Sequence, residues 1–391
     1  MTAEQVKGRL FKEQAYEVDT QTPVLTDEMI EEARRVIGYD LRWQRGMVEV
    51  TSDEIRRCAR MIGSENPLYL DEEYARRSRW GGLIAPPTLI HSAGDPQIGP
   101  GMRGLQWLYS GADWTWHKAV RVGDTVTGRG RLVDVNDKAG ATASRFALEI
   151  GEITYRNQRS EVVAVCNTVM ARTPRSRAEG GLRYDKRTPT YTVEELERIE
   201  REIVAHRSRG ANPLYWEDVS VGHAFEPVLY GPLRWVDIAL GGSVIFDVSP
   251  GAHIYQLLRR RQHPADAYID PESGIQDHPH RGHWEEFMAY EVGMPAPYDL
   301  GPDRIGWVVR ALTDWMGDDA FLGKLSIRLR RPNVVGDVTT ISAQVTHKHQ
   351  SEGSYLVDLE VRADNQSGEA SMLGSATLSL MSRNAPKEIA K

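Results

Sequence analysis

One pattern of turns and strands occurs twice in the sequence, and this repeat constrains the fold more than any other feature. Gly123-Asp124 in the first half and Gly336-Asp337 in the second half are each followed by alternating apolar and polar residues, over 127–135 and 339–346. Such alternation predicts strands. Asn157-Gln158 and Asn365-Gln366 follow at a nearly constant offset, favour hairpin turns and lead into further predicted strands over 162–171 and 371–381. The matched order predicts a duplicated module; the alternative is two unrelated all-β domains that share Gly-Asp turns by chance.

Helices are predicted ahead of the strands in each half. The segment Thr51 to Glu54 is a capping box, and the helix behind it places Ile55, Cys58, Ala59 and Ile62 on one face. In the second half, Ile305, Val308, Val309 and Leu312 repeat this spacing in a helix expected over 302–315, directly after Gly301-Pro302. One long helix and a meander of strands in each half predicts the α+β class.

The residues between the two repeats predict a linker. Residues 173–186 are rich in Arg, Gly and Pro. A second capping box at Thr192 to Glu195 then begins a helix with Leu196, Ile199 and Ile203 on one face. We therefore expect an N-terminal domain over 1–175, a linker with one helix over 176–210, and a C-terminal domain over 211–391.

Composition excludes several classes of function. The chain has 391 residues, a formal charge of −7 and no extended basic run, so nucleic acid is not an expected partner. No apolar stretch approaches the roughly 20 residues of a membrane span, and the N-terminal residues lack the pattern of a signal peptide. The two cysteines, Cys58 and Cys166, lack CxxC spacing. We therefore expect no disulfide framework or thiolate metal site, and a cytoplasmic location.

A segment of the first half carries a family resemblance. Gly63-Ser64-Glu65-Asn66-Pro67-Leu68-Tyr69-Leu70-Asp71, followed by Ala75 and by Gly81-Gly82-Leu83-Ile84-Ala85-Pro86-Pro87, resembles the signature of the MaoC-like, (R)-specific enoyl-CoA hydratases. That signature reads roughly Gly-Asp-x-Asn-Pro-Leu-His-x-Asp, then Ala, then Gly-x-Ile-Ala-His-Gly. The resemblance implies two tandem hot-dog domains, each a curved antiparallel sheet wrapped around a central helix, over about 5–175 and 211–385.

The resemblance also implies a reaction and a division of labour. In this family an Asp and a His hold a water beside the 2,3 bond of an enoyl or 3-hydroxyacyl thioester, and a Gly N–H polarises the thioester oxygen. In the first half, Ser64 replaces the Asp, Tyr69 replaces the His, and Pro86-Pro87 replaces the His-Gly pair. Since proline has no N–H, we expect this half to be a scaffold that shapes an acyl tunnel. Tyr69 and Asn66 remain candidate substrate-binding residues, with a turn role as the alternative for Asn66.

The family spacing, laid over the second half, selects other residues. His283 lies six positions before Ala289, as the family His does before its Ala, and Gly293-Met294-Pro295 follows. Gly301 falls where the oxyanion Gly of the family lies, so His283 and Gly301 are candidate catalytic residues. Asp277 is the preferred partner for the water and Asp299 the alternative, because the usual position holds His278. Leu300 replaces a family His.

Basic and histidine-rich runs suggest further contacts. Arg328, Arg330 and Arg331 are candidates to bind the phosphates of coenzyme A, with Arg259-Arg260-Arg261 as a second run and a solvated face as the alternative. His278, His280 and His283 have spacing compatible with a divalent ion, but no thiolate or HExxH helix supports such a site, and we expect neither metal nor cofactor. Trp114, Trp116, Trp284 and Trp307 are expected in the core.

The leading functional hypothesis is an acyl-CoA hydratase/dehydratase. One alternative is a catalytically inactive, acyl-CoA-binding subunit that stabilises an active partner. Another is a hot-dog thioesterase that uses Asp303 or Asp314 of the central helix. The expected assembly is a homodimer or a hetero-oligomer with another hot-dog subunit.

Overall fold

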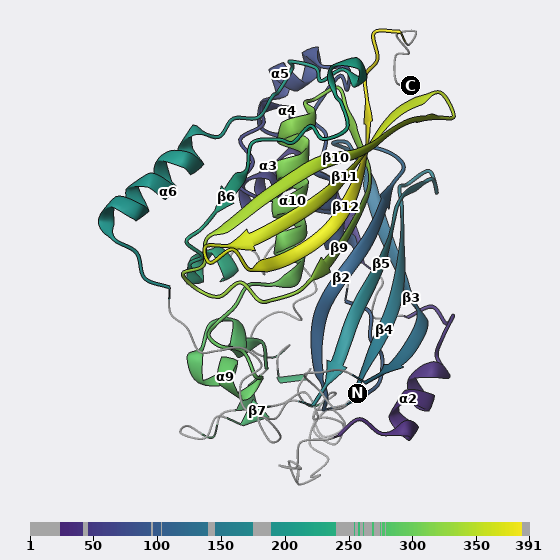
Figure 1. The fold of residues 1–391 in the computed structure, drawn as a ribbon. Helices are drawn as coiled ribbons and strands as arrows, with labels where there is room; N and C mark the ends of the chain where they lie inside the picture. The colour runs from purple at the N-terminus through teal and green to yellow at the C-terminus, as the bar shows by residue number, and fades with distance from the viewer. Residues whose placement is uncertain are drawn as a thin grey trace.

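The computed structural model describes residues 24–41, 46–94, 97–102, 104–139, 145–174, 189–239 and 279–384, together with 254, 257, 258, 261, 268, 269, 274, 276 and 277. Within this part of the chain, ten strands form one antiparallel sheet (Figure 1). The first-half strands, in their order across the sheet, are β1 (Met47–Glu49), β3 (Thr125–Lys138), β4 (Phe146–Arg156), β5 (Val162–Thr173) and β2 (Gln106–Trp116). The second-half strands continue as β9 (Phe321–Leu329), β12 (Ala370–Leu380), β11 (Ser354–Asn365), β10 (Thr339–Ser351) and β6 (Val228–Tyr230).

The second half repeats the first in reverse order across the sheet, and β2 pairs with β9 where the halves meet. The matched turns form equivalent hydrogen bonds in the two halves. Gln158 Nε2 donates a hydrogen bond to Asp124 Oδ1 over 3.0 Å, and Gln366 Nε2 donates one to Asp337 Oδ1 over 2.8 Å. The predicted strands and the predicted duplication are confirmed. A separate two-stranded sheet consists of β7 (Tyr268–Ile269) and β8 (Gln276–Asp277).

Helices pack mainly on one side of this sheet. The α-helices are α2 (Asp27–Arg34), α3 (Ser52–Met61), α4 (Pro67–Leu70), α5 (Glu72–Arg77), α6 (Val193–Ala205), α9 (Glu286–Glu291) and α10 (Gly301–Met316), and the 3₁₀ helices are η2 (Pro87–Ala93), η3 (Trp216–Asp218) and η5 (Pro279–His283). Thr51 caps α3 by accepting a hydrogen bond from the Glu54 N–H. Both predicted apolar stripes, on α3 and on α10, are buried.

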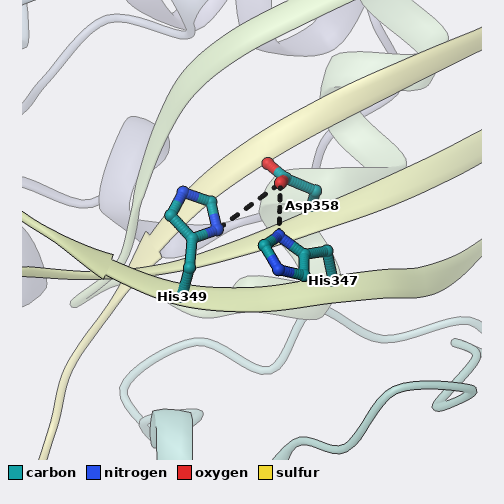
Figure 2. Close-up of side chains that lie close together, drawn as sticks. All are labelled: His347, His349 and Asp358. Atoms are coloured by element: carbon teal, nitrogen blue, oxygen red, sulfur yellow. Dashed lines mark ion pairs between the residues drawn. The ribbon is translucent and has the colours of Figure 1, made fainter.

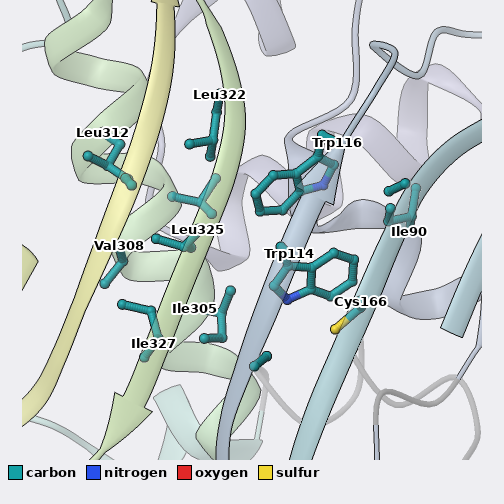
Figure 3. Close-up of a cluster of buried hydrophobic side chains, with 14 of the residues drawn as sticks. Ile90, Trp114, Trp116, Cys166, Ile305, Val308, Leu312, Leu322, Leu325 and Ile327 are labelled. Atoms are coloured by element: carbon teal, nitrogen blue, oxygen red, sulfur yellow. The ribbon is translucent and has the colours of Figure 1, made fainter. Parts of the chain in front are cut away.

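The two halves share one core. Figure 3 shows Ile305, Val308 and Leu312 of α10 beside the inward-facing residues of β9, with Trp114 and Trp116 of β2 next to them. Helices α3 and α10 also touch: a side chain added at Gly306 would place its Cβ 2.6 Å from Ile62 Cγ2. The two halves therefore approach each other closely at this point.

The central helices are unequal, which the sequence did not predict. Helix α10 has 16 residues and directly precedes β9. The element that directly precedes β2 in the first half is η2, a 3₁₀ helix of seven residues that follows Pro86. The striped helix expected in the first half is present as α3, a ten-residue helix, but η2 and not α3 directly precedes β2. Pro86 and Pro87 stand at the N-cap and first position of η2, where proline is tolerated because those N–H groups have no intrahelical partner.

Two smaller expectations also need correction. Helix α6 has the predicted capping box, but of the three residues on its predicted apolar face, Leu196, Ile199 and Ile203, only Ile199 is buried. Figure 1 shows the helix projecting from the rest of the molecule. Trp284 was expected in the core, yet 42% of it is exposed. Among the described helices, none has both the length and the apolar character needed to cross a membrane.

Candidate active site

A cavity of about 220 Å³ lies where the first turn of α10 meets strand β2 of the other half. His283 and Gly301, both selected from the sequence, line this cavity together with Arg330 and Arg331. Tyr109 of β2 also lines the cavity. The structure therefore brings together four of the eight predicted site residues and adds a wall from the first half.

The start of α10 lines this cavity through Leu300, Gly301 and Pro302. Its N-cap residue, Leu300, makes no side-chain capping hydrogen bond, and Pro302 occupies the first turn. An uncapped N-terminus of a 16-residue helix carries partial positive charge and attracts anions or developing negative charge. Gly301 is required here, because an added Cβ would lie 2.6 Å from Tyr109 Cδ1.

His283 is held in one tautomer. Its Nδ1 lies 2.8 Å from the carbonyl oxygen of Tyr298. A carbonyl oxygen can only accept, so Nδ1 carries the proton and Nε2 carries the lone pair. Loss of hydration, and secondarily the neighbouring His280, lowers the pKa of His283 to about 3. The side chain is therefore neutral at ordinary pH, which is the state that a general base requires.

Two acidic residues, Asp299 and Asp277, are candidates for the partner of His283. Asp299 lines the cavity but forms a two-point ion pair with Arg304, whose Nε and Nη2 lie 2.5 and 2.7 Å from its oxygens. Asn333 Nδ2 also donates to Asp299 over 3.1 Å. These bonds tie the start of α10 to the loop before β10. Asp277 ends β8, shortly before η5, and its side chain lies outside the described residues, as does all of His278.

The three candidate arginines separate into two groups. Arg330 and Arg331 are exposed at the wall of the cavity. Arg328 instead lies between β9 and β2, where its two terminal nitrogens each donate to a carboxylate oxygen of Asp113 over 2.8 Å. Of the second basic run, Arg259 and Arg260 lie outside the described residues.

Tyr69 and Asn66 do not line this cavity, and Tyr69 lies instead beside a second cavity of about 40 Å³. Tyr69 lines this cavity with Pro86 and Pro87, and burial raises the pKa of its phenol further above the ordinary value. Asn66 donates through Nδ2 to Asp318 Oδ1 over 2.9 Å and caps α4 by accepting from the Leu68 N–H. Tyr69 is 3% exposed and Asn66 is 1% exposed, so both lie in the packed interior.

Several residues of the larger cavity were not predicted. Tyr109, Gln106 and Arg172 come from the first half and line the cavity across the seam. Arg172 is buried and lies 2.9 Å from Glu149, whose pKa burial raises to about 7. Only the pairing of β2 with β9 brings these residues to α10. No local sequence motif marks them.

Known proteins resemble the chain in sequence over part of its length and in fold over most of it. Residues 35–166 match the family model described as FAS1-like, dehydratase domain region. A UPF0336 protein of Parafrankia sp. is 30% identical over 117 residues, which is 27% of this chain and 77% of the relative. The chain spans 65% to 77% of the length of the curated relatives that it matches.

Solved structures match over nearly the whole chain. A MaoC-like dehydratase is 16% identical with a TM-score of 0.62, over 90% of this chain and 99% of that one. A Mycobacterium tuberculosis protein described as having a double hot-dog fold is 12% identical with a TM-score of 0.51, over 92% and 98%. At such low identity these likenesses concern the fold, and they identify it as two tandem hot-dog domains. The chain belongs to the family of the UPF0336 proteins, carries a FAS1-like dehydratase region over residues 35–166, and has the double hot-dog fold seen in MaoC-like dehydratases.

Proposed function

We propose that this protein is a hydro-lyase that adds or removes water across the 2,3 bond of an enoyl or 3-hydroxyacyl thioester, and that the larger cavity is its active site. The observation that carries the proposal is the pairing, in one cavity, of His283, whose Nδ1 is held by the Tyr298 carbonyl oxygen, with the uncapped N-terminus of α10 at Gly301. Hydration needs these two things: a base for water and positive potential at the thioester oxygen.

In the hydration direction, His283 Nε2 takes a proton from a water as the water oxygen bonds to the β-carbon. The electron pair of the 2,3 bond moves towards the thioester carbonyl, whose oxygen becomes an enolate oxyanion. The Gly301 N–H and the dipole of α10 stabilise that charge. The proton then passes to the α-carbon, and the thioester carbonyl re-forms. We propose Asp277 as the second group that holds the water, as its position just ahead of η5 in the chain suggests.

The substrate's carrier would meet the positive side of the cavity. Arg330 and Arg331 are exposed there, and guanidinium groups suit phosphate in geometry and charge. We therefore propose that these two residues bind the phosphates of coenzyme A or of a carrier-protein arm. Arg331 also pairs with Glu369 over 3.2 Å but remains exposed at the cavity. Arg328 is less suited to this role because it does not line the cavity and two of its nitrogens donate to Asp113.

The surroundings of the two helix carboxyls favour a hydratase over a thioesterase. A thioesterase of this fold needs an ionised carboxylate on the central helix to activate water. Burial raises the pKa of the Asp303 carboxyl well above its usual range, which disfavours its ionised form. Asp314 is occupied by His206 Nε2 at 3.0 Å and by Arg310 Nε at 3.2 Å.

The full chain, incubated with a trans-2-enoyl-CoA, tests the proposal through the loss of enoyl absorbance. Because His283 is already neutral at low pH, kcat is expected to show no inflection between about pH 5 and 7 that belongs to this histidine. Free thiol release without hydration would indicate a thioesterase. If the chain binds acyl-CoA but shows no turnover, whether it is assayed alone or with a second hot-dog chain, it is a non-catalytic subunit.

A further inference from the structure

A second cluster of side chains lies far along the sheet, on the strands β10 and β11. His347 and His349 alternate on β10, so both project from the same face of the strand. Asp358 pairs directly with His347 on the neighbouring strand. Figure 2 shows both imidazole rings turned towards the carboxylate of Asp358. The family reaction described above uses none of these residues.

Their spacing matches the edges of a metal coordination shell. The Nδ1 atoms of His347 and His349 each lie 3.5 Å from Asp358 Oδ2, and the ligand atoms of all three residues lie within 4.8 Å of one another. Zinc bonds of about 2.0–2.2 Å in a tetrahedral shell imply ligand-to-ligand edges of about 3.3–3.6 Å. A good N–H···O hydrogen bond, by contrast, spans about 2.7–3.2 Å.

His349 adds an independent observation. Its Nδ1 is shielded from solvent and makes no hydrogen bond with any described residue. Desolvating a polar atom without a partner is costly, and a bound cation would satisfy this nitrogen. The side chain as a whole is 32% exposed, so an ion can reach it from solvent.

The carboxylate is already oriented for such a role. Thr377 Oγ1 of β12 donates a hydrogen bond to Asp358 Oδ1 over 2.6 Å, which leaves Oδ2 directed at the histidines. Outer-shell partners of this kind fix a ligand's orientation at metal sites. The register of β10 against β11 also shifts between Val345 and His347, and such bulges re-aim side chains.

We propose that His347, His349 and Asp358 form a binding site for a divalent transition-metal ion, of which Zn²⁺ and Co²⁺ are the suitable probes. Two imidazoles and a carboxylate without thiolate suit these ions. Three protein ligands leave one position of a tetrahedral shell for water or an external ligand. An ion held here links β10 to β11 near the hairpin turn at Ser351 and Ser354, so the site stabilises that hairpin.

The test is a titration of the tag-free full chain with Co²⁺, followed by the visible absorbance of the bound ion, and with Zn²⁺ by calorimetry. One ion is expected per chain at this site. His349→Ala is expected to weaken binding by more than the roughly 10–100-fold that loss of an outer-shell partner costs, and Thr377→Val to weaken it within that range. His117→Ala, an exposed histidine of the other half, is the matched control and should bind like the parent.

Thermal unfolding separates metal loss from misfolding. Zn²⁺ should raise the Tm of the parent and of His117→Ala but not of His349→Ala, while the metal-free Tm of the three proteins stays similar. The proposal is overturned if the parent binds no Co²⁺, or if His347→Ala, His349→Ala and Asp358→Asn all bind with the affinity and stoichiometry of the parent.

Discussion

The two cavities occupy equivalent places in the two halves, yet they differ in volume and in chemistry. The larger, of about 220 Å³, meets a helix that starts at Gly301 and contains a neutral histidine. The smaller, of about 40 Å³, meets a 3₁₀ helix that starts at Pro87, with Tyr69 where the histidine would be. The comparison teaches that the hot-dog fold by itself fixes neither the type of helix at this place nor the volume of the cavity beside it.

Separate substitutions of His283 and of its counterpart Tyr69 test this difference most strongly. His283→Ala should lower kcat for enoyl-CoA hydration by about 10²–10⁴-fold, because the general base is lost. Tyr69→Phe, the matched change in the first half, should leave kcat within about twofold of the parent if that cavity is not catalytic. Steady-state rates from enoyl absorbance measure both. A large loss for Tyr69→Phe, or none for His283→Ala, would reverse the assignment of the halves.

A change at the start of α10 probes the backbone donor. In Gly301→Ala the new Cβ would meet Tyr109 at 2.6 Å, so the helix start must shift. We expect kcat to fall by about 10²-fold, as it does when an oxyanion donor is displaced, and the free energy of unfolding to fall by about 1–3 kcal/mol from overpacking. Gly82→Ala, whose added Cβ meets no atom within 4 Å, is the control for stability. Unchanged kcat in Gly301→Ala would mean that the N–H is not used.

A buried histidine gives the first half its own pH signature. His91 is fully buried, its ring centroid lies 4.8 Å from that of Trp114, and burial lowers its pKa to about 3. The unfolded chain, with a histidine pKa near 6.5, binds the extra proton, so stability is present above about pH 6.5 and is lost as the pH falls towards 3.

The variant His91→Phe should therefore reduce the pH dependence of the free energy of unfolding by up to about 1.4 kcal/mol per pH unit in this window. Urea unfolding at several pH values between 4 and 6.5 measures the slope. A slope equal to that of the parent would show that His91 is not kept neutral.

The arginines at the larger cavity should affect binding more than chemistry. Arg331→Gln is expected to raise KM for an acyl-CoA by about tenfold with kcat nearly unchanged, since one charged hydrogen bond to phosphate is lost. The effect should shrink at high salt, where such contacts are screened. If kcat falls while KM is constant, the residue acts on the reacting atoms instead.

The smallest effect is expected at the seam. Arg328 and Asp113 are each 40% exposed, and exposed ion pairs contribute at most about 1 kcal/mol. Arg328→Gln should therefore lower the free energy of unfolding by less than about 1 kcal/mol and leave KM unchanged. A KM change as large as that of Arg331→Gln would return Arg328 to the substrate-binding group.

Sequence reasoning succeeded where the relevant order is local. Alternation and paired turn residues predicted the strands of both halves, and the Gly301-Pro302 step predicted the start of α10. It did not predict that a 3₁₀ helix, η2, directly precedes β2. It could not find Tyr109 or Arg172, since strand pairing between the halves brings them to the cavity. The exposure of Trp284 was not predicted either, because apolar character alone does not fix burial.

The continuous sheet joined at β2 and β9 has a further consequence for how such a chain can change. In a symmetric dimer of identical hot-dog subunits, every substitution appears at both sites at once, so a change that closes one closes the other. Fusion of the two copies into one polypeptide removes that constraint. One site is then free to lose its donor and its volume while the other is retained, and the retained site keeps needing the altered half, because residues such as Tyr109 form its wall.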